Sequence, residues 1–156
     1  MSSSELVAVD LTERERKFIW HALHEWRNSA AWKPFPIQVL GLSTWDEFDE
    51  LTGRLALAVM AGQSLTMLDW ARMLYLTECS WASSLVGAAL DFSIVTGFSD
   101  TEAVSLLRGL QRKVGGIEWA DALFPGHGRH RPIEEWKRES ARIVREQQGR
   151  TYPPGL

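Results

Sequence analysis

The chain has 156 residues, of which 45% are hydrophobic and 24% charged, and its formal net charge is −3. These values are typical of one folded domain that buries about two-thirds of its unfolded surface, and they exclude a disordered chain. The longest uncharged run, residues 55–68, contains 14 residues and is too short to span a bilayer.

The start of the chain lacks the basic and apolar segments of a signal peptide, and its single cysteine, Cys79, cannot form an internal disulfide. We therefore expect a cytoplasmic protein with no membrane association. Of the 17 basic residues, 13 are Arg, which favours a GC-rich bacterial source.

Charge is distributed unevenly along the chain. Residues 1–107 carry 7 Lys or Arg against 14 Asp or Glu, whereas residues 108–156 carry 10 against 6. The basic part can pack on the acidic part within one fold, or it can bind an anionic partner.

Helix starts are the strongest structural signal in chain order. Thr12, Thr44 and Ser99 are each followed three residues later by Glu, which is the capping-box spacing. In this arrangement the hydroxyl and the carboxylate satisfy free backbone N–H groups reciprocally. The spacing predicts helices over residues 12–27, 44–62 and 99–114.

A fourth predicted helix, over about residues 66–82, is apolar on almost every side. Such a helix must be surrounded by others. We therefore predict an all-α fold, a single globular domain of five to six helices around this central buried helix. The domain spans residues 1–156, and we expect residues 1–10 and 149–156 to be flexible tails.

The remaining segments give weaker signals. Two prolines precede residues 36–40, where one short helical turn can form. Residues 83–97 fit a helix with a break near residues 83–87, which we favour, but they also fit an extended segment. Residues 117–131 are predicted to be a loop in which one helical turn can form over residues 119–123.

Pro132 suits the first position of a last helix, over about residues 133–148. Its apolar stripe is narrow, so we expect an amphipathic helix that docks on the outside of the domain by one edge.

Glu78 is the most unusual residue of the central helix. At about 100° per residue it lies opposite Asp69, among apolar side chains. A buried carboxylate there is paired with an Arg or a helix N-terminus, rotated toward solvent, or protonated, and pairing is the ordinary explanation. A general acid or base needs a second polar group, and Asp91 is the candidate nearest in sequence. The hypothesis of a small-ligand binder or enzyme therefore requires a pocket at Glu78.

Two His-x-x-His sequences, His21 with His24 and His127 with His130, could together supply four metal ligands. The spacing differs from that of zinc peptidase motifs, in which two histidines stand four apart around a Glu. Surface histidines placed by chance are the simpler interpretation, and we predict no metal and no cofactor.

Trp20 projects away from the apolar face of the first helix, beside Arg16 and His24. It can stack on either of them, since each is four residues away. Alternatively it anchors a partner, because exposed Trp beside Arg is typical of interface hot spots. Trp32, in the loop after this helix, could belong to the same surface.

Arginines gather on the last two long helices. Arg108 and Arg112 are predicted to face outward on the first of them, and Arg138, Arg142 and Arg145 share a face on the second. Interleaved glutamates favour a solvated helix with internal ion pairs, and the alternative is non-specific contact with phosphates.

No catalytic or phosphate-binding motif is present, no catalytic residue is assigned, and a non-enzyme is favoured. The leading hypothesis is a small cytoplasmic interaction or regulatory protein that binds a protein partner, or itself, through an exposed aromatic–basic surface. The first alternative is a nucleic-acid-associated helical protein that uses its basic C-terminal helices. The second is the ligand binder or enzyme with a pocket at Glu78.

Overall fold

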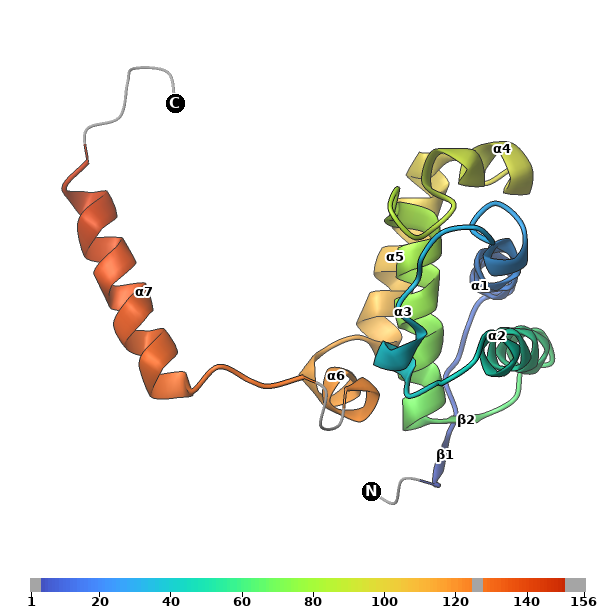
Figure 1. Cartoon of the computed structure of the whole chain (residues 1–156), viewed down its shortest axis with the longest axis horizontal. Coiled ribbons are helices and arrows are strands. Elements are labelled where there is room, and N and C mark those ends of the chain that lie inside the picture. Colours follow the sequence, from blue (N-terminus) through green and yellow to red (C-terminus); the bar gives the residue numbers. More distant parts are fainter. Residues whose placement is uncertain (1–3, 125–127, 151–156) are drawn as a thin grey trace. The chain divides into compact units, whose positions relative to one another are not determined.

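A computed structural model describes residues 4–124 and 128–150, and within these residues the regular secondary structure is helical apart from one pair of two-residue strands, with turns and loops between the elements (Figure 1). The α-helices are α1 (Glu13–His24), α2 (Trp45–Met60), α3 (Met67–Ala82), α4 (Phe92–Thr96), α5 (Asp100–Val114), α6 (Ile117–Leu123) and α7 (Ile133–Gln148). The strands are β1 (Leu6–Val7) and β2 (Leu65–Thr66), and 3₁₀-helices lie at Glu25–Arg27, Ile37–Leu40 and Ala89–Asp91. The predicted all-α fold is confirmed.

The chain forms two compact units, residues 1–125 and 126–156. The first holds α1 to α6 and both strands, and the second holds α7. No helix in the described part of the chain combines the length and apolar character that crossing a membrane requires.

The long helices of the first unit begin at the predicted side-chain caps. Thr12 Oγ1 accepts a hydrogen bond from Glu15 N at 3.1 Å, and Glu15 Oε1 accepts one from Thr12 N at 2.8 Å. The hydroxyls of Thr44, Thr66 and Ser99 each accept the backbone N–H three residues further on, but of these four described helix starts only Thr12 has the reciprocal bond of the predicted capping box. These local bonds satisfy donors that the first helical turn leaves free, so the helix starts follow from sequence alone.

The core of the first unit lies between α1 and α3. The helix α3 packs against α1, α5 and α6, and its Trp70, Met73 and Leu76 side chains are at most 1% exposed. Helix α1 also packs on α2 and α5, and its Phe18 and Ile19 are fully buried. The central position predicted for residues 66–82 is therefore shared by α1.

Glu15 at the start of α1 is buried, and it bonds to α5. Lys113 Nζ lies 2.5 Å from Glu15 Oε1. Burial alone would raise the pKa of Glu15, but the hydrogen bonds from Lys113 and Thr12 outweigh it and lower the pKa below its ordinary value. The carboxylate therefore joins the two helices as an ion pair.

Residues 6 and 7 form a strand within the segment 1–10 that we expected to be a flexible tail, and residues 1–3 lie outside the described residues. Strand β1 pairs antiparallel with β2, with Leu6 opposite Thr66 and Val7 opposite Leu65. The buried Trp70 donates from Nε1 to Val7 O at 2.8 Å. A buried indole N–H needs an acceptor, and the strand supplies it. Of the predicted tail at residues 149–156, residues 151–156 lie outside the described residues.

The weaker segment predictions met different outcomes. A 3₁₀-helix occupies Ile37–Leu40, as expected for one short turn. The favoured interpretation of residues 83–97, a helix with a break, is confirmed, because a turn precedes the 3₁₀-helix and α4. Within the loop expected over residues 117–131, the helical turn expected at residues 119–123 is present as part of the longer helix α6, which packs on α3. That packing stabilises a helix whose sequence alone gives a weak signal.

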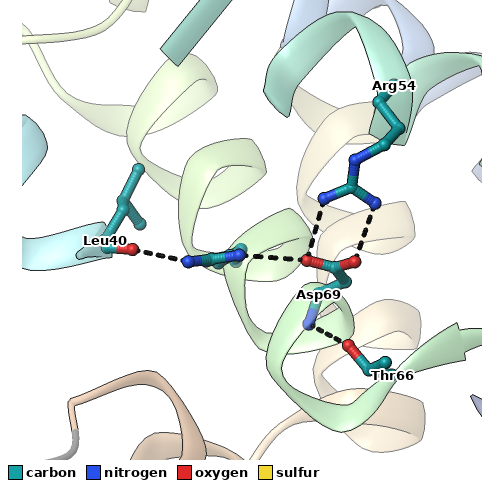
Figure 2. Close-up of polar contacts among 5 residues, drawn as sticks. Leu40, Arg54, Thr66 and Asp69 are labelled. Carbon is teal, nitrogen blue, oxygen red and sulfur yellow. Dashed lines mark hydrogen bonds and ion pairs between the residues drawn. The ribbon is translucent and has the colours of Figure 1, made fainter. Parts of the chain in front are cut away.

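Asp69, on the first turn of α3, is a buried carboxylate with two arginine partners (Figure 2). Arg54 of α2 donates to both carboxylate oxygens, at 2.8 and 3.3 Å. Arg72 donates to Asp69 Oδ1 at 3.2 Å and to Leu40 O at 2.8 Å. Burial would raise the pKa of Asp69, but the hydrogen bonds and charge of Arg54 and then Arg72 lower it. This network joins α2, α3 and the turn that ends at Leu40.

Gly53 lies within α2, where an alanine would be better accommodated. A Cβ built at Gly53 would have only the guanidinium of Arg27 within 4 Å, at 3.7 Å. Alanine favours a helix interior over glycine by about 0.8–1 kcal/mol. We expect Gly53→Ala to raise the free energy of unfolding by about 0.5–1 kcal/mol, measured by urea denaturation. A lower denaturation midpoint would contradict this prediction.

In the second unit, α7 coincides with the predicted helix over residues 133–148. Its apolar side chains lie near one side of the helix and are 42–59% exposed. They are Ile133, Trp136, Ile143 and Val144. The docking of this helix on the domain stays a prediction.

Candidate functional site

A pocket of about 350 Å³ lies beside Glu78 in the first unit. Its walls come from α3, from the end of α5 with the two glycines that follow, and from α6. Most of the lining is apolar or aromatic, as in small-molecule sites, which combine such walls with a few polar groups. The largest apolar side chains of the lining are Leu74, Tyr75, Val114, Trp119, Leu123 and Phe124.

Glu78 and Gln111 supply the charged and amide side chains of this pocket. Gln111 Nε2 donates to Glu78 Oε2 at 2.7 Å, and Gln111 Oε1 accepts from Arg108 Nη1 at 2.6 Å. Because both ends of the amide are engaged, the side chain of Gln111 is held in one orientation. Among the described residues, no group donates to the other oxygen, Glu78 Oε1.

The carboxylate of Glu78 differs in its partner and its burial from what the sequence predicted. Glu78 is half-buried and bonded to an amide, whereas we expected an Arg or a helix N-terminus as its partner. Asp69 is the more deeply buried of the two. Asp91, the candidate second polar group nearest in sequence, is exposed in the 3₁₀-helix and does not line the pocket, whereas Gln111 does. The turn that follows the end of α3 places Asp91 away from the helix face that carries Glu78.

Two further titratable groups lie near Glu78 on α3. Burial raises the pKa of Tyr75, and Cys79 and Glu78 raise it further. Burial also raises the pKa of the Cys79 thiol, more than the hydrogen bond with Tyr75 lowers it. The thiol is therefore protonated at neutral pH and is a poor nucleophile.

On α1, the side chain of Trp20, which was predicted to form an aromatic surface, is partly covered by His24. The rings of Trp20 and His24 stack with centroids 3.7 Å apart, and His24 Nδ1 lies 2.8 Å from Trp20 O. Trp20 is half-buried against the core, and Arg16 is half-buried as well. The stacking interpretation therefore fits Trp20, with His24 as the partner. Trp32, by contrast, is 97% exposed.

The histidine pairs give no metal site in the part of the chain that is described. His21 contacts the rings of Trp20 and Phe98, and burial lowers its pKa. No group of three or more His, Cys, Asp or Glu side chains that could hold a metal lies among these residues. His130 is exposed, and His127 lies outside the described residues.

The predicted basic residues are divided between the two units. Arg108 and Arg112 are exposed on α5, and Arg108 is engaged with Gln111. On α7, Arg138, Arg142 and Arg145 lie on the side opposite the apolar stripe, at about 100° per residue. Arg142 pairs with Glu139 and Glu146, as expected for a solvated helix. Phosphate contact by these arginines stays a prediction.

The structure also exposes a group of large apolar side chains within residues 85–104 that sequence reasoning missed. We name it the 85–104 surface, after its members Leu85, Leu90, Ile94, Val95 and Val104, which are 38–85% exposed. Leu90 and Val104 line one groove of about 640 Å³ between the turn after α3 and the start of α5. The available signal was the run of residues 85–95, which contains several large apolar side chains and a single charge, Asp91.

Comparison with known protein families, curated proteins and solved structures finds no match to this chain.

Proposed function

We propose that the chain is a helical interaction protein that binds a protein partner through the 85–104 surface. The observation that carries this proposal is the exposure of Leu85, Leu90 and Ile94, each of which is at least 79% exposed. Single exposed leucines are ordinary, but several in one short segment beside an apolar groove are typical of a binding surface.

The geometry of the segment supports a defined surface. Leu90 and Ile94 are four residues apart in consecutive helical turns, so they lie on the same face. Between them and α3, Ala89 has a φ of 48°, in the left-handed region that non-glycine residues rarely adopt. Strained residues of this kind are concentrated at functional sites.

The exposed tryptophan of the predicted aromatic surface extends this region. Trp32 precedes Lys33, whose ammonium donates to Ser84 O at 3.3 Å and also to Gly87 O. The loop of Trp32 is therefore attached to the turn that carries Leu85. Trp20 contributes less, because it is already covered by its own His24.

Charge indicates the chemistry of the partner. From residue 73 to residue 107 the chain has four carboxylates and no Lys or Arg. Asp100 lines the groove, and Asp91 is exposed next to Leu90. A partner that supplies an amphipathic helix with an apolar stripe and basic flanks complements such a surface.

The test compares a double variant of the 85–104 surface with a single charged substitution elsewhere on the first unit. Leu90→Glu combined with Ile94→Glu places charge on the 85–104 surface, and Leu57→Glu does the same at a side chain of α2 that is 72% exposed. Because these positions are exposed, far-UV circular dichroism should show both variants folded. We expect the Leu90/Ile94 variant to lose the partner that wild type captures, with wild-type cross-links mapping to residues 85–104, and the Leu57 variant to keep it.

Sedimentation velocity of the same three proteins separates a second copy of the chain from another protein as the partner. Cross-links that map elsewhere, or equal capture by all three proteins, would contradict the proposal.

A further inference from the structure

We infer that the pocket beside Glu78 binds a small organic cation with an aromatic or bulky apolar body. This site lies between α3, α5 and α6, and it is separate from the 85–104 surface of the proposed function. The inference depends on the size of the pocket, on its aromatic walls and on the single charge that faces it.

The volume and lining of the pocket set the kind of molecule it can hold. About 350 Å³ is within the range of small-ligand sites, near its lower end. Tyr75 and Phe124 stand edge to face, with centroids 5.7 Å apart, and Trp119 lines the same space. A ligand body of one aromatic ring or a branched alkyl group fits such walls, and aromatic faces also attract a cation.

The charge of the pocket selects the head group of the ligand. Glu78 is the one charged side chain among the described residues that line it. Its Oε2 is held by Gln111, whereas Oε1 has no hydrogen-bond donor from the described residues. An ammonium or amidinium group can donate to Oε1 and form a charge-assisted hydrogen bond, while a carboxylate ligand would be repelled.

Arg108 and Gln111 orient the Glu78 carboxylate that accepts the hydrogen bond of this head group. The guanidinium of Arg108 holds Gln111 Oε1, which turns the amide N–H toward Glu78. Gln111 thereby fixes the carboxylate before a ligand arrives, which reduces the entropy cost of binding. Arg108 is a positioning residue here, since it contacts Gln111 and does not line the pocket.

The experiment uses the full chain and three probes of similar size: 2-phenylethylamine, 2-phenylethanol and 3-phenylpropanoate. Binding is followed by ¹H–¹⁵N NMR titration, with backbone shifts at Gly115, Gly116 and Trp119 as the readout for this pocket. We expect the amine to bind and to move these signals, the alcohol to bind at least about tenfold more weakly, and the carboxylate to leave them unmoved.

Three variants assign the effect to the pocket. Glu78→Gln should weaken amine binding at least about tenfold, because it removes the charge and keeps the shape. Ala120→Leu, at an exposed position that lines the pocket, should weaken all binding by filling the space. Glu118→Gln, on the same helix and outside the lining, is the matched control and should bind as wild type does.

Equal binding of the amine, the alcohol and the carboxylate would overturn the inference, as would amine binding that survives Glu78→Gln. Absence of any shift at these residues with millimolar amine would overturn it as well. None of these results bears on partner binding at the 85–104 surface, so the two proposals fail separately.

Discussion

Replacing Asp69 with alanine is expected to lower the free energy of unfolding at neutral pH by about 3 kcal/mol. The substitution removes the carboxylate from Arg72, whose side chain is 17% exposed and is held in place by Leu40 O. Removing one partner of a buried ion pair costs about 3–5 kcal/mol. We expect the lower end of that range because the side chain of Arg54 is 50% exposed. Urea denaturation followed by circular dichroism measures the change.

The control for this prediction is Asp46→Ala. Asp46 is also an acidic residue in the first turn of a helix, but it is exposed and makes no ion pair with the described residues. Its removal should cost only the interaction with the helix dipole, about 0.3–1 kcal/mol. If both substitutions lower the free energy of unfolding by the same amount, the ion pairs of Asp69 with its two arginines do not stabilise the fold.

The same network predicts how stability depends on pH. The pKa of Asp69 is lowered in the folded protein from its ordinary value of 3.8. The folded state therefore binds this proton less readily than the unfolded chain does, and the stability from the ion pairs is fully present above pH 3.8. It is lost as pH falls below that value through the lowered pKa. Asp69→Asn should lose this part of the acid sensitivity, and an unchanged pH profile would contradict the assignment.

Gly87→Ala is expected to lower the free energy of unfolding by about 3 kcal/mol, because the turn after α3 approaches that helix too closely for a side chain. A Cβ at Gly87 would lie 1.8 Å from Cys79 O and 2.8 Å from Ser80 O. These are backbone atoms of the last turn of α3, and Ala88 N also donates to Ser80 O at 2.7 Å. The clash cannot be relieved by a side-chain rotation, so the turn must move.

Gly97→Ala is the matched control, at the end of α4. Nothing lies within 4 Å of a Cβ there, and the strain comes only from its φ of +79°. We expect it to cost about 1–2 kcal/mol, measured by thermal unfolding beside Gly87→Ala. Gly87 does not have a positive φ, so a Gly87→Ala variant as stable as wild type would show that the close approach to α3 has no effect. A larger loss at Gly87, with weaker partner capture, would connect this turn to the 85–104 surface.

The sequence predicted those parts of the fold that local interactions determine. The helix starts at Thr12, Thr44, Thr66 and Ser99 follow from a hydroxyl and a backbone N–H three residues apart. The apolar character of residues 66–82 likewise predicted a buried helix. The strand β1 was not predicted, because its two residues find their partners at residues 65 and 66.

The candidate site was predicted only in part, for the same reason. The odd position of Glu78 was visible from helical periodicity, but its partner Gln111 is 33 residues away. Periodicity shows which side chains share a face and gives no information about what packs against that face. The exposure of Leu90 and Ile94 was missed because the same apolar pattern describes a core and a binding surface.

The ion pair between Glu15 and Lys113 has a consequence for biosynthesis. The two residues are 98 positions apart, and Glu15 is 4% exposed. During translation α1 leaves the ribosome long before α5 is synthesised, so the nascent chain cannot yet neutralise this carboxylate inside a packed core. We therefore expect α1 to pack less stably until Lys113 has emerged and can pair with Glu15.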